Sequence, residues 1–172
     1  MATKQDTLAA EFYHNYIKLA PDENMVKALE KNTRNFRKLL KKIPRKKIDK
    51  AYAEGKWTIK ELLQHMIDAE RVFAYRALTF ARKDSTSLPS FDENAWAGNS
   101  LASQRNWKEM VEEFRLLRAA NERMFASFGD GQLRSIGTAS GKEINVLALG
   151  FILAGHVEHH INIIKERYLK KN

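Results

Sequence analysis

The fold class is decided by one stretch of sequence, Thr58–Phe80, which is TIKELLQHMIDAERVFAYRALTF. It opens with Thr58 and Glu61 in a capping-box pattern, in which the two side chains satisfy the first free amides of a helix. No glycine or proline interrupts the stretch. One mainly apolar face follows at helical spacing, made of Leu62, His65, Ala69, Val72, Phe73, Arg76 and Phe80. The stretch therefore predicts a long amphipathic helix with one buried face.

Two further stretches without glycine or proline have the same helical spacing of apolar residues. The first, residues 22–43, stops at a proline and offers Asp22 as its N-cap. The second is expected to begin near Ser103 or Trp107 and to end before Gly129. Each predicts a long amphipathic helix that packs one face against the first.

The C-terminal part predicts a fourth long helix. Ser140–Glu143 matches a second capping box, and the helix is expected to run from there to about Tyr168. A short helix is expected near residues 8–19, and no stretch alternates with the period of a strand. The chain is therefore predicted to be all-α, a four-helix bundle with a short extra N-terminal helix, in one domain over residues 1–172.

Composition excludes several classes of protein. The chain has 172 residues, of which 44% are hydrophobic and 30% charged, as in a globular protein. It has no cysteine, which excludes disulfides, thiolate metal sites and iron–sulfur clusters and fits a reducing compartment. The longest uncharged stretch, residues 144–157, is shorter than the roughly 20 residues that span a bilayer. We expect a cytoplasmic protein without a membrane segment.

The net charge of +9 comes from one segment, residues 27–50, which holds eleven basic residues and two acidic ones. Its basic stripe lies opposite the apolar face of the predicted helix and consists of Lys27, Lys31, Arg34, Lys38, Lys41 and Arg45. Two interpretations remain open: a solvated helix face, or a surface by which a non-enzymatic dimeric scaffold contacts an anionic partner. Nucleic acid is the less favoured partner, because no base-reading aromatics accompany the charges.

Three of the five histidines are predicted to face the bundle core. His156 and His160 are four residues apart and so project from one face of the last helix, while His65 lies on the apolar face of its own helix. His159 points about 60° away from His156. A single buried histidine is usually just hydrogen-bonded, but three in one core leave several nitrogens to satisfy. Residue chemistry leaves open whether they share a metal ion or only hydrogen bonds.

Three motifs resemble the DinB/YfiT-like superfamily in their order and spacing. The resemblance rests on residues 56–76, which contain the pattern W-T-x-x-E-x-x-x-H, on residues 91–96, and on residues 154–160 with their HxxxH. It covers nearly the whole chain, from about Tyr13 to Tyr168. The resemblance implies an up-down-down-up bundle with a divalent metal ion held by His65, His156 and His160.

The same resemblance implies a metal-dependent hydrolase or a thiol-dependent transferase. Three protein ligands leave a coordination position for water or substrate, as in catalytic sites. The metal is expected to be zinc, nickel or iron, since all three accept imidazole. The expected partners are a small-molecule substrate, including a low-molecular-weight thiol, and a second copy of the chain in a homodimer.

Five other residues are candidates for the surroundings of the site. His159, Asp68 and Glu70 are near the ligands in sequence and are candidates for hydrogen bonding to them, because metal-bound histidines need such partners. Phe91 and Trp96 are expected either to line a pocket over the metal or to pin their loop to the bundle. No residue stands out as the general base.

Overall fold

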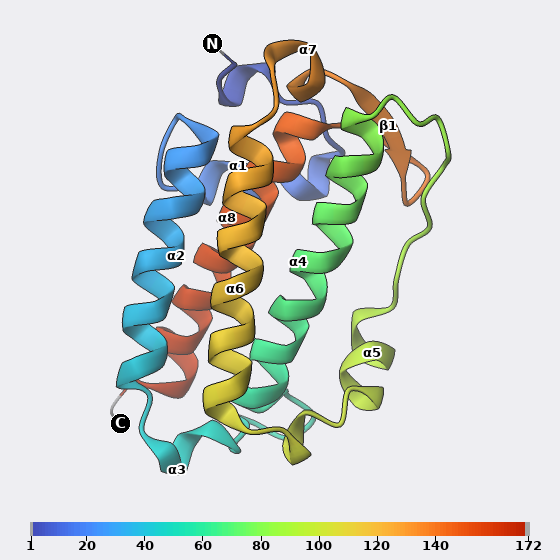
Figure 1. Cartoon of the computed structure of the whole chain (residues 1–172). Helices are drawn as coiled ribbons and strands as arrows, with labels where there is room; N and C mark the ends of the chain where they lie inside the picture. The colour runs from blue at the N-terminus through green and yellow to red at the C-terminus, as the bar shows by residue number, and fades with distance from the viewer. Residues whose placement is uncertain (1, 171–172) are drawn as a thin grey trace.

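The computed structural model describes residues 2–170, and four long helices lie side by side in it as a bundle (Figure 1). The four are α2 (Met25–Lys42), α4 (Ile59–Ala81), α6 (Trp107–Ala126) and α8 (Val146–Ile163). Helices α4 and α6 run in one direction, and α2 and α8 run in the other. The order is up-down-down-up, because the long connection between α4 and α6 returns along the bundle before α6 begins. The predicted fold class is confirmed.

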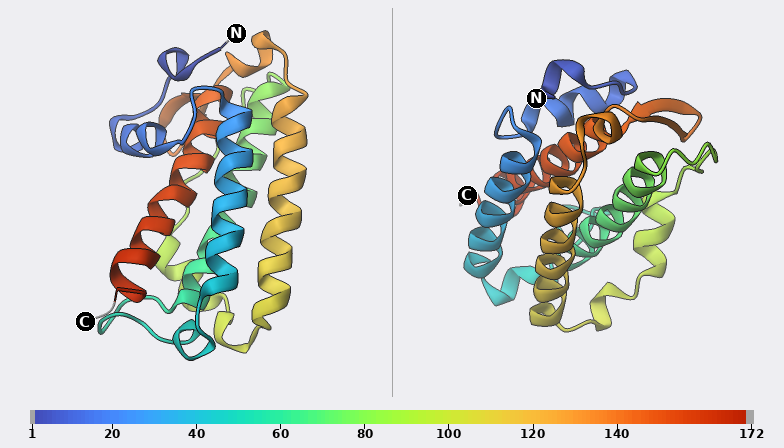
Figure 2. Two further views of the ribbon diagram at one scale, coloured as in Figure 1. Left: turned by 90° about the vertical axis from the view of Figure 1, so that its left-hand side faces the viewer. Right: turned by 45° about the horizontal axis from the view of Figure 1, so that its top comes forward.

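Each long helix packs against two others, so the four close around a common core. Helix α2 contacts α6 and α8, and α4 contacts the same two. Helix α8 is the most enclosed, since the short N-terminal helix α1 (His14–Leu19) covers a further side of it (Figure 2). By length and composition Val146–Tyr168 is apolar enough to cross a membrane, but 78% of its most apolar window is buried inside the bundle. Its apolar character is that of a core helix.

The helix starts follow local hydrogen bonding. The Thr58 hydroxyl accepts a bond from the Glu61 amide at 3.1 Å and the Glu61 carboxylate accepts one from the Thr58 amide at 2.7 Å, so the predicted capping box is confirmed. The prediction of Asp22 as the cap of α2 is wrong. Asn24 is the cap, accepting from the Lys27 amide at 3.0 Å, while Asp22 accepts from the Asn24 amide and shapes the turn before it.

A hairpin stands where the second capping box was predicted. Strands β1 (Ile136–Ala139) and β2 (Lys142–Asn145) pair antiparallel, and Ser140 and Gly141 between them have φ of 55° and 71°. Two positive φ values in a two-residue loop define a turn whose twist suits a hairpin. Helix α8 therefore begins later than predicted, with Asn145 as its cap. The prediction of no strands is wrong for this segment.

Short helices, turns and the hairpin lie around the four long helices. The predicted N-terminal helix is present as a 3-10 turn, Glu11–Tyr13, followed by α1. Helix α3 lies at one end of the bundle, α7 and the hairpin lie at the other, and α5 lies beside α4 (Figure 1). The remaining bounds are α3 Arg45–Ile48, α5 Glu93–Asn99, α7 Asp130–Leu133, 3-10 turns Lys4–Asp6 and Ala102–Gln104, and a π turn Ile164–Tyr168 that continues α8.

Candidate metal centre

Three histidines from two helices converge inside the bundle. His65 comes from the second turn of α4, and His156 and His160 come from successive turns of α8. The Nε2 atom of His156 lies 3.0 Å from that of His65 and 3.0 Å from that of His160. All three side chains are buried, and one nitrogen from each lies within 4.8 Å of the other two. The sequence placed these residues on inward faces, and the structure brings them together.

The donor set fits a shared cation better than it fits hydrogen bonds alone. A neutral imidazole carries one N–H, so the Nε2 of His156 can donate to only one of the two nitrogens that face it. Nδ1 of His160 is also buried without a hydrogen-bond partner in the described part of the chain, and a cation on Nε2 would not change this. Imidazole nitrogens about 2.0–2.1 Å from a common ion stand roughly 3 Å apart. The spacing and the unsatisfied pairing both suit a metal ion.

The electrostatics keep these imidazoles neutral, which is the form that binds a metal. Burial lowers the pKa of His65 to about 4, with a smaller contribution from the nearby His159. Burial, followed by repulsion from the other imidazoles, holds the pKa of His156 and of His160 well below the usual range. At neutral pH the cluster therefore presents lone pairs and no positive charge of its own.

Two aromatic side chains border the cluster. The Trp57 ring lies 4.8 Å from that of His65 between centroids, and the Tyr16 ring meets His156 edge-on at 5.5 Å. Trp57 belongs to the motif that begins α4, whereas nothing in the sequence pointed to Tyr16. Its placement depends on how closely α1 approaches α8, which a local pattern does not report.

His159 lies beside the cluster rather than in it. Its ring is 5.1 Å from that of His160 and 5.5 Å from that of Tyr16, and its side chain is half-buried. Burial lowers its pKa. The off-axis direction expected from helix geometry agrees with this position.

The two carboxylates near the ligands in sequence bond elsewhere. Asp68 accepts a bond from Gln64 at 2.9 Å and lies 4.0 Å from Arg71, and burial raises its pKa. Glu70 is buried and points to another side of α4, where its two oxygens accept bonds from Arg118 at 2.6 Å and Asn121 at 2.7 Å. Neither is hydrogen-bonded to a histidine among the described residues. Their assignment as partners of the ligands has no support from these contacts.

Arg118 was not singled out from the sequence, yet it is fully buried between the helices. Besides Glu70 it donates to Thr33 and Asn32 of α2, both at 3.1 Å, and so ties α2, α4 and α6 together. In the sequence it stands among the charged residues of an amphipathic helix, and its periodicity gives no sign of burial. Arg118 also lies 3.4 Å from the Leu153 carbonyl of α8, so the network contacts all four long helices.

Phe91 and Trp96 pack on each other beside α4, with ring centroids 4.9 Å apart, and Trp96 stays 45% exposed. Arg76 holds this loop: it donates to the Pro89 carbonyl at 2.6 Å and to the Ser140 hydroxyl at 3.2 Å, and its guanidinium lies 6.0 Å from the Phe91 ring centre. Arg76 therefore fastens the loop to α4. That Phe91 and Trp96 line a pocket over the metal stays a prediction.

The fold and the site together define a four-helix-bundle protein with a buried three-histidine cluster. The chain belongs to the DinB superfamily, whose family model matches residues 28–164. It is 31% identical over 147 residues to a protein of Oceanobacillus iheyensis named "Putative metal-dependent hydrolase", with 81% of each chain covered.

A solved structure has the same fold. YfiT from Bacillus subtilis, described as a probable metal-dependent hydrolase with an unusual four-helix bundle topology, matches with a TM-score of 0.73. The match covers 92% of this chain and 87% of that one at 16% sequence identity. At that identity the likeness establishes the fold alone.

Proposed function

We propose that His65, His156 and His160 hold a divalent metal ion and that the protein is a metal-dependent hydrolase of small molecules. The observation that carries the proposal is the convergence of three buried Nε2 atoms, with His156 within 3.0 Å of both others. The names of the Oceanobacillus iheyensis relative and of YfiT support it. Zinc, nickel and iron(II) are all compatible with three imidazoles.

The chain's own residues would position and shield such an ion. Three neutral ligands keep its full charge and leave a coordination position open. A metal ion bound there supplies a Lewis acid that polarises a substrate oxygen and lowers the pKa of water. Trp57 and Tyr16 pack against two of the ligands and limit the approach of solvent from their sides. His159, beside the cluster but outside it, is placed to exchange a proton with a bound substrate.

The test is metal content of protein purified without an affinity tag. We expect about one ion per chain in the wild type and none in His160→Ala, whereas His159→Ala keeps the ion with an affinity reduced by at most about tenfold. Each variant removes one imidazole, and the two positions are adjacent in α8, so each variant serves as the control for the other. Retention of metal by His160→Ala, or equal loss in both variants, would overturn the ligand assignment.

Turnover assays separate the reaction classes at this site. A hydrolase cleaves an ester or amide panel without a thiol, and the rate falls with the metal in His160→Ala. A thiol-dependent transferase, the second reaction that the sequence resemblance implies, needs a low-molecular-weight thiol for any product. Metal-free protein that turns over substrate equally well would exclude both.

The remaining expectations complete the proposal: one domain over residues 1–172, a cytoplasmic location and a homodimer. Sedimentation equilibrium gives the oligomeric state directly.

The competing non-enzymatic role rests on α2, whose Lys27, Lys31 and Arg34 are exposed. A duplex or single-stranded DNA probe that shifts at low salt, together with absent turnover, would favour that role over the hydrolase.

A further inference from the structure

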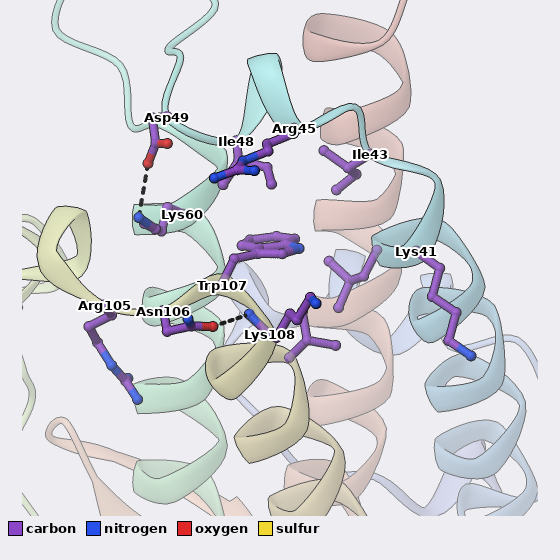
Figure 3. Close-up of a pocket in the computed structure, with 12 residues that line it drawn as sticks. Lys41, Ile43, Arg45, Ile48, Asp49, Lys60, Arg105, Asn106, Trp107 and Lys108 are labelled. Carbon is purple, nitrogen blue, oxygen red and sulfur yellow. Dashed lines mark hydrogen bonds and ion pairs between the residues drawn. The ribbon is translucent and has the colours of Figure 1, made fainter.

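A pocket of about 780 Å³ opens at the end of the bundle where α3 lies. It lies where α2 ends, α3 crosses and α6 begins, with the first turn of α4 at its side (Figure 3). None of the three histidines lines it. The proposed metal site therefore does not account for this cavity.

The lining of the pocket is strongly basic. Five of its residues carry positive charge, namely Lys41, Arg45, Lys60, Arg105 and Lys108, against the single carboxylate of Asp49. That carboxylate is already bound to Lys60 at 3.0 Å, and Arg105 is paired with Glu113. No ion pair occupies Lys41, Arg45 or Lys108 within residues 2–170. Three exposed cations of one sign therefore surround the mouth of the recess and are available to an anionic ligand.

The floor of the same pocket is apolar. Leu40, Ile43 and Ile48 line it and are almost completely buried. Figure 3 shows the indole of Trp107 between Ile48 and Arg45 on one side and Lys108 on the other. A flat aromatic surface next to free cations suits a ligand that has both an apolar body and an anionic group. A simple inorganic anion would leave this floor unused.

We propose that this pocket binds a small amphipathic anion: an organic phosphate, sulfonate or carboxylate with an aromatic or aliphatic body. The body packs on Trp107 and the apolar floor, and the anionic group reaches Arg45, Lys41 and Lys108 at the rim. The site is separate from the histidine cluster, so its occupancy does not depend on a metal ion.

Dodecyl phosphate, kept below its critical micelle concentration, is the probe for calorimetric titration of the full-length protein. We expect saturable binding of one molecule per chain, weakened at least tenfold in the double variant Lys41→Ala, Arg45→Ala. The matched control is Lys27→Ala, Arg34→Ala, which removes one lysine and one arginine from the exposed face of α2 outside the pocket. The control is expected to bind within twofold of the wild type.

A second variant tests the apolar part. Trp107→Ala keeps every charge and is expected to weaken dodecyl phosphate at least fivefold while leaving weak inorganic phosphate binding unchanged. Circular dichroism confirms that each variant is folded. If both double variants lost affinity for dodecyl phosphate equally, binding would depend only on general surface charge, and the proposal would be overturned.

The surface of a lipid bilayer also combines anionic groups with apolar chains. The third experiment is therefore co-sedimentation of the protein with phosphatidylglycerol vesicles. We expect no vesicle binding at physiological salt, because the cations stand around a recess and not on a flat face. Vesicle binding that depends on Lys41 and Arg45, without binding of monomeric dodecyl phosphate, would overturn the proposal in favour of a membrane surface.

Discussion

Replacing Gly155 by alanine is expected to detach α1 from the bundle. A Cβ at this position would lie 1.7 Å from the carbonyl oxygen and 2.4 Å from the carbonyl carbon of Tyr16. Contacts of a real Cβ essentially never fall below 3.0 Å, so the two backbones must separate by about 1.3 Å. A backbone cannot rotate away as a flexible side chain can, and α1 therefore has to move as a unit.

The cost follows from what α1 buries on α8. Ile17 and Ala20 are 7% and 4% exposed, and burying an isoleucine side chain contributes about 1.5–3 kcal/mol. Alanine is favoured over glycine inside a helix by about 1 kcal/mol, but α8 is helical whether or not α1 is docked, so this gain adds to global stability and does not offset the loss of docking. We expect a destabilisation of α1 docking by about 2 kcal/mol, or roughly thirtyfold in its local opening equilibrium.

Gly150→Ala is the matched control in the same helix. Its Cβ would meet the Sδ atom of Met25 at 2.6 Å, the far part of a flexible side chain that can change rotamer. The gain in helix propensity is the same, so the difference between the two variants isolates the backbone clash. We expect Gly150→Ala to change stability by less than about 1 kcal/mol.

Hydrogen exchange of the α1 amides measures this local opening directly, with urea denaturation reporting the bundle. Gly155→Ala should accelerate exchange in residues 14–19 about thirtyfold and leave α4 and α6 nearly unchanged. Unchanged exchange in α1, or the same acceleration in Gly150→Ala, would refute the reasoning. Because Tyr16 lies against His156 and His159, the variant also tests whether α1 contributes to the candidate site.

Three further outcomes are expected in urea denaturation. Thr58→Ala removes the cap of α4 and should cost about 1 kcal/mol; a change below about 0.3 kcal/mol would contradict its role. Burial raises the pKa of Tyr168 to about 12 from 10.0, and the neutral hydroxyl donates to the Trp57 carbonyl, so this stabilisation is complete below pH 10 and lost as pH rises to about 12. Tyr168→Phe should therefore cost about 1–2 kcal/mol at pH 8 and almost nothing near pH 12, and a cost that does not vary with pH would contradict this. Arg118→Met leaves the buried Glu70 without its charge partner and should cost about 3–5 kcal/mol, of which Glu70→Gln in the same chain should restore a part; a double variant no more stable than the single one would argue against the buried pair.

The long helices could be predicted because their determinants are local. Periodicity and the Thr58–Glu61 box act within a few residues, so one sequence suffices to place α4. The hairpin could not be placed in the same way. Ser140–Glu143 satisfies the letters of a capping box, but Ser140 donates its amide to the Leu88 carbonyl at 2.9 Å, and Leu88 donates to Thr138 at 2.9 Å. A loop more than fifty residues away decides that this segment is a strand and a turn.

In the candidate site, too, the residues set by local helix geometry could be predicted, and those set by contacts between helices could not. Helix geometry was enough to put His65, His156 and His160 on inward faces, because four residues return a helix to nearly the same direction. Tyr16 and Arg118 depend on how separate helices dock, and no pattern within one helix reports that. Closeness in sequence says less: Glu70 is five residues from His65 but lies on another side of α4, bonded to Arg118.

Helix α8 explains why three polar side chains can stand at fixed positions in an apolar interior. It is enclosed by α1, α2 and α4, so its residues are apolar on nearly every side, and His156 and His160 are buried among them. Gly155 lets α1 close over one side, while the adjacent His156 points to the side that α4 occupies with His65. The three side chains are therefore held by packing, and the unpartnered Nδ1 of His160 is a cost that the apolar contacts of α8 must offset. Side chains held in this way would need little reorganisation to bind the proposed metal ion.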